Sequence, residues 1–515
     1  MNPKFAAVKN HFTNWREWEL NPIVIKELRQ AVRSWAVTGM LLLFLTVLFI
    51  TSLVFLVGQS FNVHENTELG GTMFQAFAVI LAGASILFIP LYIGVRVGAE
   101  RVESNTDLLY VSTLSPGRII RGKLLCGAYM ALLFFSACMP FMAFTNLLRG
   151  VDLPSVFFIL FFLFLVVCAA NQIAIFLACL PLSRPFKVLL ALAGFFFSFW
   201  IIGGMIAMTF QMMRSGVGAM MADRNFWIAI GTALGAGVAL VGLFYVLSVA
   251  LISPPSANRA RQPRRYLTLV WLLGGALTII WIFQVAQPEL ILVWTYATFF
   301  LMVFALLVTI SNADELSPRV RRDIPAGGLR RLLAFPFFNG AAGGLVWVAG
   351  LTGLTFLLSE LILTHARDWF SASFSLSSTD QEKIWLYNST LIAYAFAYAL
   401  TALFIHRQFM PRRQPKIAGL LIVLLAGLWA IVPGIVLFFL NKLSWKSVES
   451  LQLGNMFNIF SLQEDGQRIY HLYFATGWLV LVLALNAPWF LRQWRNFQPL
   501  PARVPPPLAE TTPVP

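Results

Sequence analysis

The chain has 515 residues, of which 59% are hydrophobic and only 11% charged, and its formal net charge is +15. Soluble domains carry roughly 25% charged residues, so this composition excludes a water-soluble globular protein and predicts an all-α integral membrane protein. The basic residues lie between apolar runs rather than in one patch, and no recognition module accompanies them, so we expect no nucleic-acid partner.

Residues 1–36 precede the first apolar run and predict a cytoplasmic amphipathic helix. Asn21 is a good N-cap and Pro22 suits the first helical turn. The apolar positions that recur at spacings of three and four are Ile25, Leu28, Val32 and Trp35. Basic residues occupy much of the remainder, which is typical of a helix lying in the membrane surface. The alternative is a plain basic anchor ahead of the first span.

Twelve apolar runs are long enough to cross a bilayer, since a spanning helix needs roughly 20 apolar residues. Each run is expected to be helical because lipid offers no partners to open backbone groups. The predicted spans are 37–58, 72–95, 124–147, 154–181, 188–211, 226–252, 266–284, 290–310, 342–364, 385–406, 417–440 and 471–491. With the N-terminus inside, 29 of the 37 Lys and Arg residues fall on the inner side, which predicts that both termini are cytoplasmic.

The chain divides into two sets of six spans. Residues 37–252 form the first bundle and 266–491 the second, with a basic cytoplasmic linker at 253–265 between them. Residues 492–515 form a Pro-rich cytoplasmic tail without apolar periodicity. The two halves share no recognisable repeat.

The early loop 96–123 carries its own apolar pattern around a Ser115-Pro116-Gly117 turn. This pattern indicates either docking to another protein or packing on the loop's own bundle. The run from Gly117 to Lys123 has the spacing of a phosphate-binding loop, but Leu124 stands where Ser or Thr should hold magnesium, and no strand precedes it. The chain therefore has no ATP site of its own at this position.

Few polar residues lie within the spans. Asn171 and Gln172 in the fourth span either line a transport path or bond between helices. Glu360 lies near the outer end of its span. The histidines and cysteines form no ligand set and no catalytic constellation stands out, so we expect neither a metal site nor an enzyme.

Two stretches resemble the ABC-2-type transporter permeases. The first reads Asn21-Pro22-Ile-Val-Ile-Lys26-Glu27-Leu28-Arg29, before the first span. The second, after the second span, contains Glu100-Arg101, Leu108-Leu109, Ser112-Thr113-Leu114-Ser115-Pro116, Gly117 and Gly122-Lys123. The resemblance covers roughly residues 20–250.

This resemblance implies a permease subunit of the bacterial inner membrane, driven by a separate ATP-binding cassette ATPase. ATP and magnesium would sit on that partner, and this chain would hold no cofactor. The loop 99–118 would be the coupling element, and two permease chains would pair. The alternative function is a secondary, ion-coupled transporter with six plus six spans, which the scarcity of buried acids disfavours.

Overall fold

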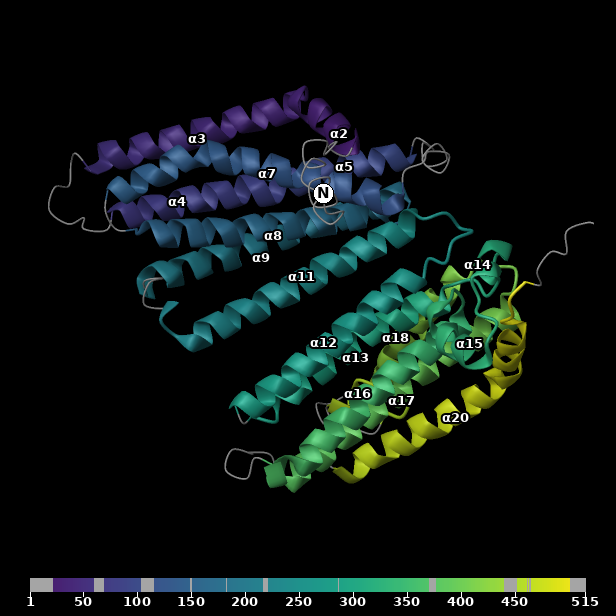
Figure 1. Ribbon diagram of the computed structural model, residues 1–515. Coiled ribbons are helices and arrows are strands. Elements are labelled where there is room, and N and C mark those ends of the chain that lie inside the picture. The colour runs from purple at the N-terminus through teal and green to yellow at the C-terminus, as the bar shows by residue number, and fades with distance from the viewer. Residues whose placement is uncertain are drawn as a thin grey trace, which may run out of the picture. The chain divides into compact units, whose positions relative to one another are not determined.

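The computed structural model describes the protein over residues 22–59, 69–102, 115–148, 151–181, 183–215, 221–285, 287–369, 377–439, 452–460, 462 and 465–500. These residues form helices and connecting turns, with no strand among them. Twelve of the described helices are long and apolar enough to cross a membrane, which confirms the predicted all-α, multi-span class. The chain separates into two compact units, Met1–Pro254 and Pro255–Pro515 (Figure 1).

Unit 1 contains a short helix followed by six spans. Its elements are α2 (Pro22–Val32), α3 (Trp35–Gln59), α4 (Leu69–Gly83), η1 (Ala84–Phe88), α5 (Ile89–Val102), α7 (Pro116–Leu147), α8 (Leu153–Cys179), α9 (Arg184–Ser215) and α11 (Arg224–Ile252). In Figure 1, α2 joins the start of the long helix α3 at one end of the unit, here called the α2 end.

The second span is one continuous passage from Gly70 to Glu100 with a π-helical turn, η1, in its middle. Pro90 follows that turn. A proline inside a helix has no N–H to donate and its ring crowds the carbonyl one turn earlier. A wider π turn accommodates such a defect, and π turns of this kind are frequent at functional sites.

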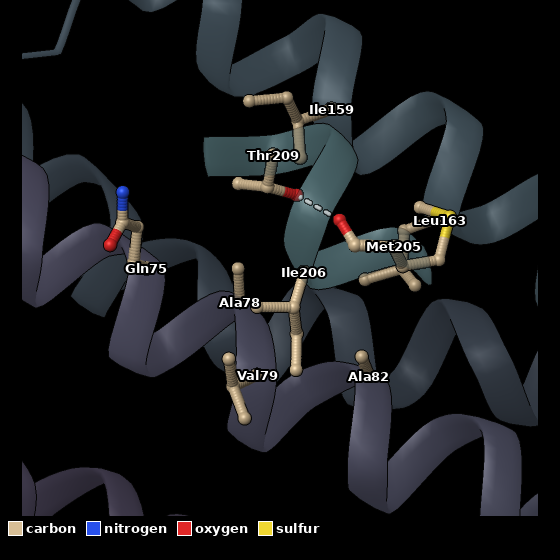
Figure 2. Close-up of a pocket in the computed structure, with 9 residues that line it drawn as sticks. All are labelled: Gln75, Ala78, Val79, Ala82, Ile159, Leu163, Met205, Ile206 and Thr209. Carbon is tan, nitrogen blue, oxygen red and sulfur yellow. Dashed lines mark hydrogen bonds between the residues drawn. The ribbon is translucent and has the colours of Figure 1, made fainter. Parts of the chain in front are cut away.

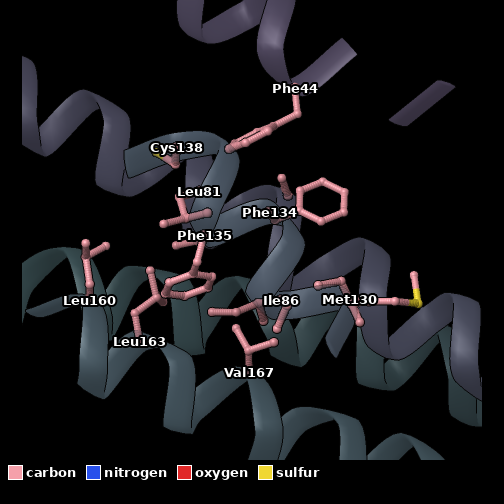
Figure 3. Packing of buried hydrophobic residues seen from close by; sticks show 14 of the residues in the cluster. Phe44, Leu81, Ile86, Met130, Phe134, Phe135, Cys138, Leu160, Leu163 and Val167 are labelled. Atoms are coloured by element: carbon pink, nitrogen blue, oxygen red, sulfur yellow. The ribbon is translucent and has the colours of Figure 1, made fainter. Parts of the chain in front are cut away.

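The core of unit 1 lies among α4, η1, α5, α7 and α8. Figure 3 shows Phe44 of α3 and Phe134 of α7 packed together, with ring centroids 5.3 Å apart. Leu81, Ile86 and Val167 are also fully enclosed there. By contrast, α3 and α9 expose large apolar side chains along most of their length, as expected for helices that face lipid.

In the part of the chain that the structure describes, unit 2 contains six spans and four short helices. Its elements are α12 (Arg261–Val285), α13 (Leu290–Ile310), α14 (Pro318–Arg322), α15 (Gly328–Ala334), η2 (Phe335–Phe337), α16 (Ala341–Trp369), α17 (Ser378–Phe409), α18 (Lys416–Phe439), η3 (Asn458–Phe460) and α20 (Asp465–Asn496). Its main core joins α13, α16, α17 and α20.

Helix bounds differ from the predicted spans mainly at the polar ends. The third span begins at Pro116 rather than 124, and the last ends at Asn496 rather than 491, so the predicted tail starts too early. Hydropathy locates only the part of a helix that lies in hydrocarbon, whereas backbone hydrogen bonding continues beyond it.

The C-terminal part of the predicted linker 253–265 is helical. The boundary between the units falls at Pro254–Pro255, within the predicted range, but α12 already begins at Arg261. The side chain of Arg264, within the predicted linker, is buried in unit 2.

Candidate functional site

Five charged residues meet at the α2 end of unit 1, and we call them the ionic cluster. They are Lys26 and Glu27 of α2, Arg96 and Glu100 of α5, and Lys123 of α7. One set of ion pairs therefore joins three helices. Its most distant members, on α2 and α7, are more than 90 residues apart in the sequence.

Lys123 is the centre of the ionic cluster. Its Nζ lies 3.1 Å from Oε1 of Glu27 and 2.6 Å from Oε2 of Glu100. The side chains of Lys123 and Glu27 are only 8% and 7% exposed. The outer cations, Arg96 and Lys26, each approach one of the two carboxylates at 3.9 Å. Removing one partner of such a buried pair typically costs about 3–5 kcal/mol, because the remaining charge is left without compensation.

The helices position these side chains through their local sequence. Glu27 lies on the same face of α2 as Val24 and Ala31, and all three are buried. The helix α7 starts after Ser115, with Pro116 in its first turn, so Lys123 lies two turns inside the helix. The ammonium therefore reaches back toward the end of α5, where Glu100 is placed.

The surface helix α2 has a second, apolar face. Ile25, Val32 and Trp35 just beyond it are exposed, with Val32 at 72% and Trp35 at 89%. Leu28 is partly buried against the core of unit 1. These exposed side chains are available to lipid, as the amphipathic pattern predicts. The burial of Glu27 against the bundle was not predicted by the apolar periodicity.

Around the predicted coupling loop, the structure describes the two ends. Arg101 is helical in α5, Ser115 precedes α7, and Pro116 and Gly117 form its first turn. The Tyr245 hydroxyl of α11 donates to the Gly117 carbonyl oxygen at 3.3 Å. Three predicted coupling residues, Leu108, Leu109 and Leu114, and the predicted N-cap Asn21 lie outside the described residues. Arg29, predicted for the interface helix, is exposed on α2.

Asn171 and Gln172 are completely buried in α8. Gln172 donates from Nε2 to the Ser248 hydroxyl of α11 at 3.3 Å, so it bonds between helices. Asn171 lies against Gly127 of α7, where a β-carbon would come within 2.9 Å of its amide nitrogen. Neither residue lines the two cavities that α4, α5, α8 and α9 enclose in unit 1.

Unit 2 contains a buried polar layer on three helices that the sequence did not reveal. It comprises Thr295 and Thr298 of α13, Thr352 and Ser359 of α16, and Asn388 of α17, together with Glu360 of α16, which is half-buried but has an enclosed Oε1 atom. Within the described part of the chain, the Ser359 hydroxyl, Glu360 Oε1 and both amide atoms of Asn388 are buried without a hydrogen-bond partner. Such orphaned groups are costly in an apolar surrounding and mark a place where something polar belongs.

Two contacts between neighbouring helices indicate that three of these residues, Thr298, Ser359 and Asn388, lie at similar depth. Gly344 at the start of α16 lies directly against Thr309 near the end of α13. The Gln381 amide of α17 donates to the Leu363 carbonyl oxygen of α16 at 3.0 Å. The three helices are antiparallel to their neighbours, so residues can be counted along each axis from these contacts. By this count, the depths of Thr298, Ser359 and Asn388 along the helix axes differ by about one helical turn.

Arg264 is the other charged residue whose position only the structure reveals. Its guanidinium donates to the carbonyl oxygens of Pro336 at 2.8 Å, Phe338 at 2.7 Å and Gly340 at 3.4 Å. It also lies over the Trp347 ring at 6.0 Å. In the sequence Arg264 lies among three other arginines, and no neighbouring residue indicates that this one is buried.

A polar pocket of about 310 Å³ lies beside this region, lined by Asp314, Glu315, Leu316, Arg321, Gln493 and Asn496. Burial raises the pKa of the Asp314 carboxyl, although Trp489 and the backbone of Ala341 donate hydrogen bonds to it. Among the described residues, no group of three or more His, Cys, Asp and Glu side chains could hold a metal ion.

The chain was compared with protein-family models, with curated proteins and with solved structures, and no match was found in any of the three.

Proposed function

We propose that this protein is the membrane-spanning permease subunit of an ABC transporter, driven by a separate ATP-binding subunit. The observation that carries the proposal is the ionic cluster. Lys26-Glu27, Glu100 and Lys123 come from the separate stretches that resemble ABC-2-type permeases, and they meet in one place. The resemblance depends on short sequence motifs that are far apart in the chain. The contact between these motifs in one ionic cluster supports the proposal.

The ionic cluster supplies a mechanical link between a docking loop and the spans. The two helices on either side of residues 103–114 are joined, since Lys123 of α7 donates to Glu100 of α5 and to Glu27 of α2. A displacement of this segment by a bound ATPase would therefore move α2, α5 and α7 together. For ATP to drive transport, the ATPase must bind the two membrane states with different affinity.

The remaining parts of the proposal follow from this role. The α2 end of unit 1 faces the cytoplasm of a bacterium, two permease chains pair, and ATP with magnesium binds to the partner subunit. The positive-inside distribution of Lys and Arg supports this orientation in the inner membrane.

A mild-detergent pulldown of the tagged chain, analysed by mass spectrometry, tests this function. We expect an ATP-binding cassette subunit to copurify with the wild type. The double variant Glu100→Ala/Leu114→Asp should reduce its recovery by about tenfold, which corresponds to a loss of about 1.4 kcal/mol in docking. The matched control is Glu315→Ala/Leu329→Asp, which places the same substitutions at exposed positions in unit 2.

Equal loss from both double variants would place docking outside the loop of unit 1. The absence of any ATPase from an intact, monodisperse wild-type preparation would contradict the permease assignment.

The buried polar layer of unit 2 favours ion-coupled transport as the second candidate function. Hydroxyl, amide and carboxylate oxygens are the ligands that hard cations prefer. Glu360 would supply the negative charge, and an ionisable residue inside a span is by default a functional candidate.

Cation flux into liposomes containing the purified chain tests this second candidate. If unit 2 carries a cation, an imposed sodium or proton gradient drives flux in the absence of ATP, and Glu360→Gln abolishes it. Glu382→Gln, an exposed glutamate at the start of α17, should leave the flux unchanged. Flux that is equal in both variants, or no flux in the wild type, would exclude the second candidate.

A further inference from the structure

Two cavities lie in line along the seam that α4, η1 and α5 form with α8 and α9 in unit 1. The smaller has a volume of about 20 Å³, room for a single water. Figure 2 shows it between Gln75 and Ala78 of α4, Ile159 of α8, and Ile206 and Thr209 of α9. The larger has a volume of about 340 Å³ and continues the seam toward the α2 end. We call this larger cavity the groove.

Small residues on three helices form part of the wall of the groove. Gly94 and Gly98 of α5, Ala174 of α8, and Ala191 and Gly194 of α9 line it. The helix α9 packs against α4, η1 and α8, but it makes few contacts with α5. The π turn η1 lies where the groove begins, since Ile86 and Leu87 are among its lining residues.

The dimensions of the groove match one leaflet of a bilayer. Along the second span its lining runs from Ile86 to Gly98, which corresponds to about 18 Å of helix. The hydrocarbon layer is about 30 Å thick, so the groove extends from near its middle to one surface. An elongated apolar molecule entering from that leaflet would fill it.

A positive charge marks the surface end of the groove. Lys187, near the start of α9, lines the groove and is half-buried, with its ammonium 3.5 Å from the Ala178 carbonyl oxygen. A lysine at this depth buries its alkyl stem and holds its charge at the headgroup level. Basic pockets between spans at this level bind anionic lipid headgroups.

We propose that the groove binds an anionic phospholipid, with one acyl chain along α5, α8 and α9 and its phosphate at Lys187. The apolar lining accepts the chain, the small residues provide its volume, and the ammonium selects the negative headgroup. This inference depends only on the membrane-spanning fold of unit 1 and holds independently of the proposed function.

Lipid retention measured by native mass spectrometry tests the proposal. The purified wild-type protein is exchanged into detergent containing equal amounts of phosphatidylglycerol and phosphatidylcholine of the same chain length. We expect about a fivefold preference for phosphatidylglycerol, because one lysine near the surface contributes about 1 kcal/mol toward an anionic lipid. Lys187→Gln should abolish the preference while leaving some lipid bound.

The blocking variant is Gly194→Trp, whose side chain would occupy the groove and displace both lipids. Its matched control is Gly204→Trp, on the same helix but outside the lining of the groove, where no atom lies within 4 Å of an added β-carbon. If Gly194→Trp fails to fold, as judged by gel filtration, Ala191→Trp replaces it. The proposal is overturned if the blocking variant retains as much lipid as its control, or if Lys187→Gln keeps the preference.

Discussion

Replacing Lys123 with methionine is expected to detach α2 from unit 1 and to lower the free energy of unfolding by about 3–5 kcal/mol. Methionine preserves most of the volume of the lysine stem but removes the charge from between Glu27 and Glu100. Glu27 is buried and, among the described residues, would keep the ion pair with Arg96, whose Nε lies 3.9 Å away. The measurement is thermal or denaturant unfolding in detergent, together with limited proteolysis of the segment that holds α2.

The control for this prediction is Arg121→Met. Arg121 lies on the same turn of α7 but is exposed, and its Nε donates to the Gly117 carbonyl oxygen at 3.3 Å. We expect it to change stability little, since exposed charges contribute about 0–1 kcal/mol. Adding Glu27→Gln to Lys123→Met should recover part of the loss, because it removes the uncompensated carboxylate. If Lys123→Met is as stable as Arg121→Met, the ionic cluster does not hold α2 in place.

Replacing Arg264 with leucine is expected to unfold the start of unit 2. The guanidinium bonds three carbonyl oxygens of the turn that leads into α16, and at 4% exposure it is shielded from water. Its loss would remove the guanidinium donor from the Pro336 and Phe338 carbonyl oxygens, at a cost of about 1–3 kcal/mol for each group left unsatisfied. The Gly340 carbonyl oxygen would keep the backbone N–H of Gly344 as a donor. Since whole domains are stable by only about 5–15 kcal/mol, we expect poor expression and early aggregation, measured by gel filtration in detergent.

Arg265→Leu provides the matched control for Arg264→Leu. It is the next residue of α12, is exposed, and loses the same charge. Arg264→Lys tests the geometry, because a lysine ammonium cannot reproduce the planar fork that reaches several acceptors at once. We expect Arg264→Lys to be destabilised as well, by less than leucine. Equal stability of the Arg264→Leu and Arg265→Leu variants would contradict the role assigned to these three hydrogen bonds.

The two largest effects are predicted for residues that lie at the ends of spans rather than within them. Both Lys123 and Arg264 are buried cations that join segments distant in sequence. In a bilayer, apolar side chains gain little by moving from lipid to a helix interface, so packing and polar contacts determine which helices associate. This explains why a few charged contacts matter so much in a chain with only 11% charged residues.

The sequence by itself determined the class of this protein and the number of its spans. Every segment that crosses the hydrocarbon layer needs about 20 apolar residues and must satisfy its backbone hydrogen bonds internally. A helix fulfils both conditions without contacts to the rest of the chain. Local signals therefore located the twelve spans, the turn at 287–289, and the short helix that begins at Pro22.

Only the tertiary structure decided which faces of these helices meet. The sequence named Glu27, Glu100 and Lys123 as pieces of a resemblance, but their pairing results from the packing of α2, α5 and α7. Likewise, Arg264 looks like any linker arginine, and Asn388 like any polar residue near a span end, until folding buries them. The physical reason is that helices which are apolar on every side carry no periodicity to mark an interface, so long-range packing alone selects the buried face.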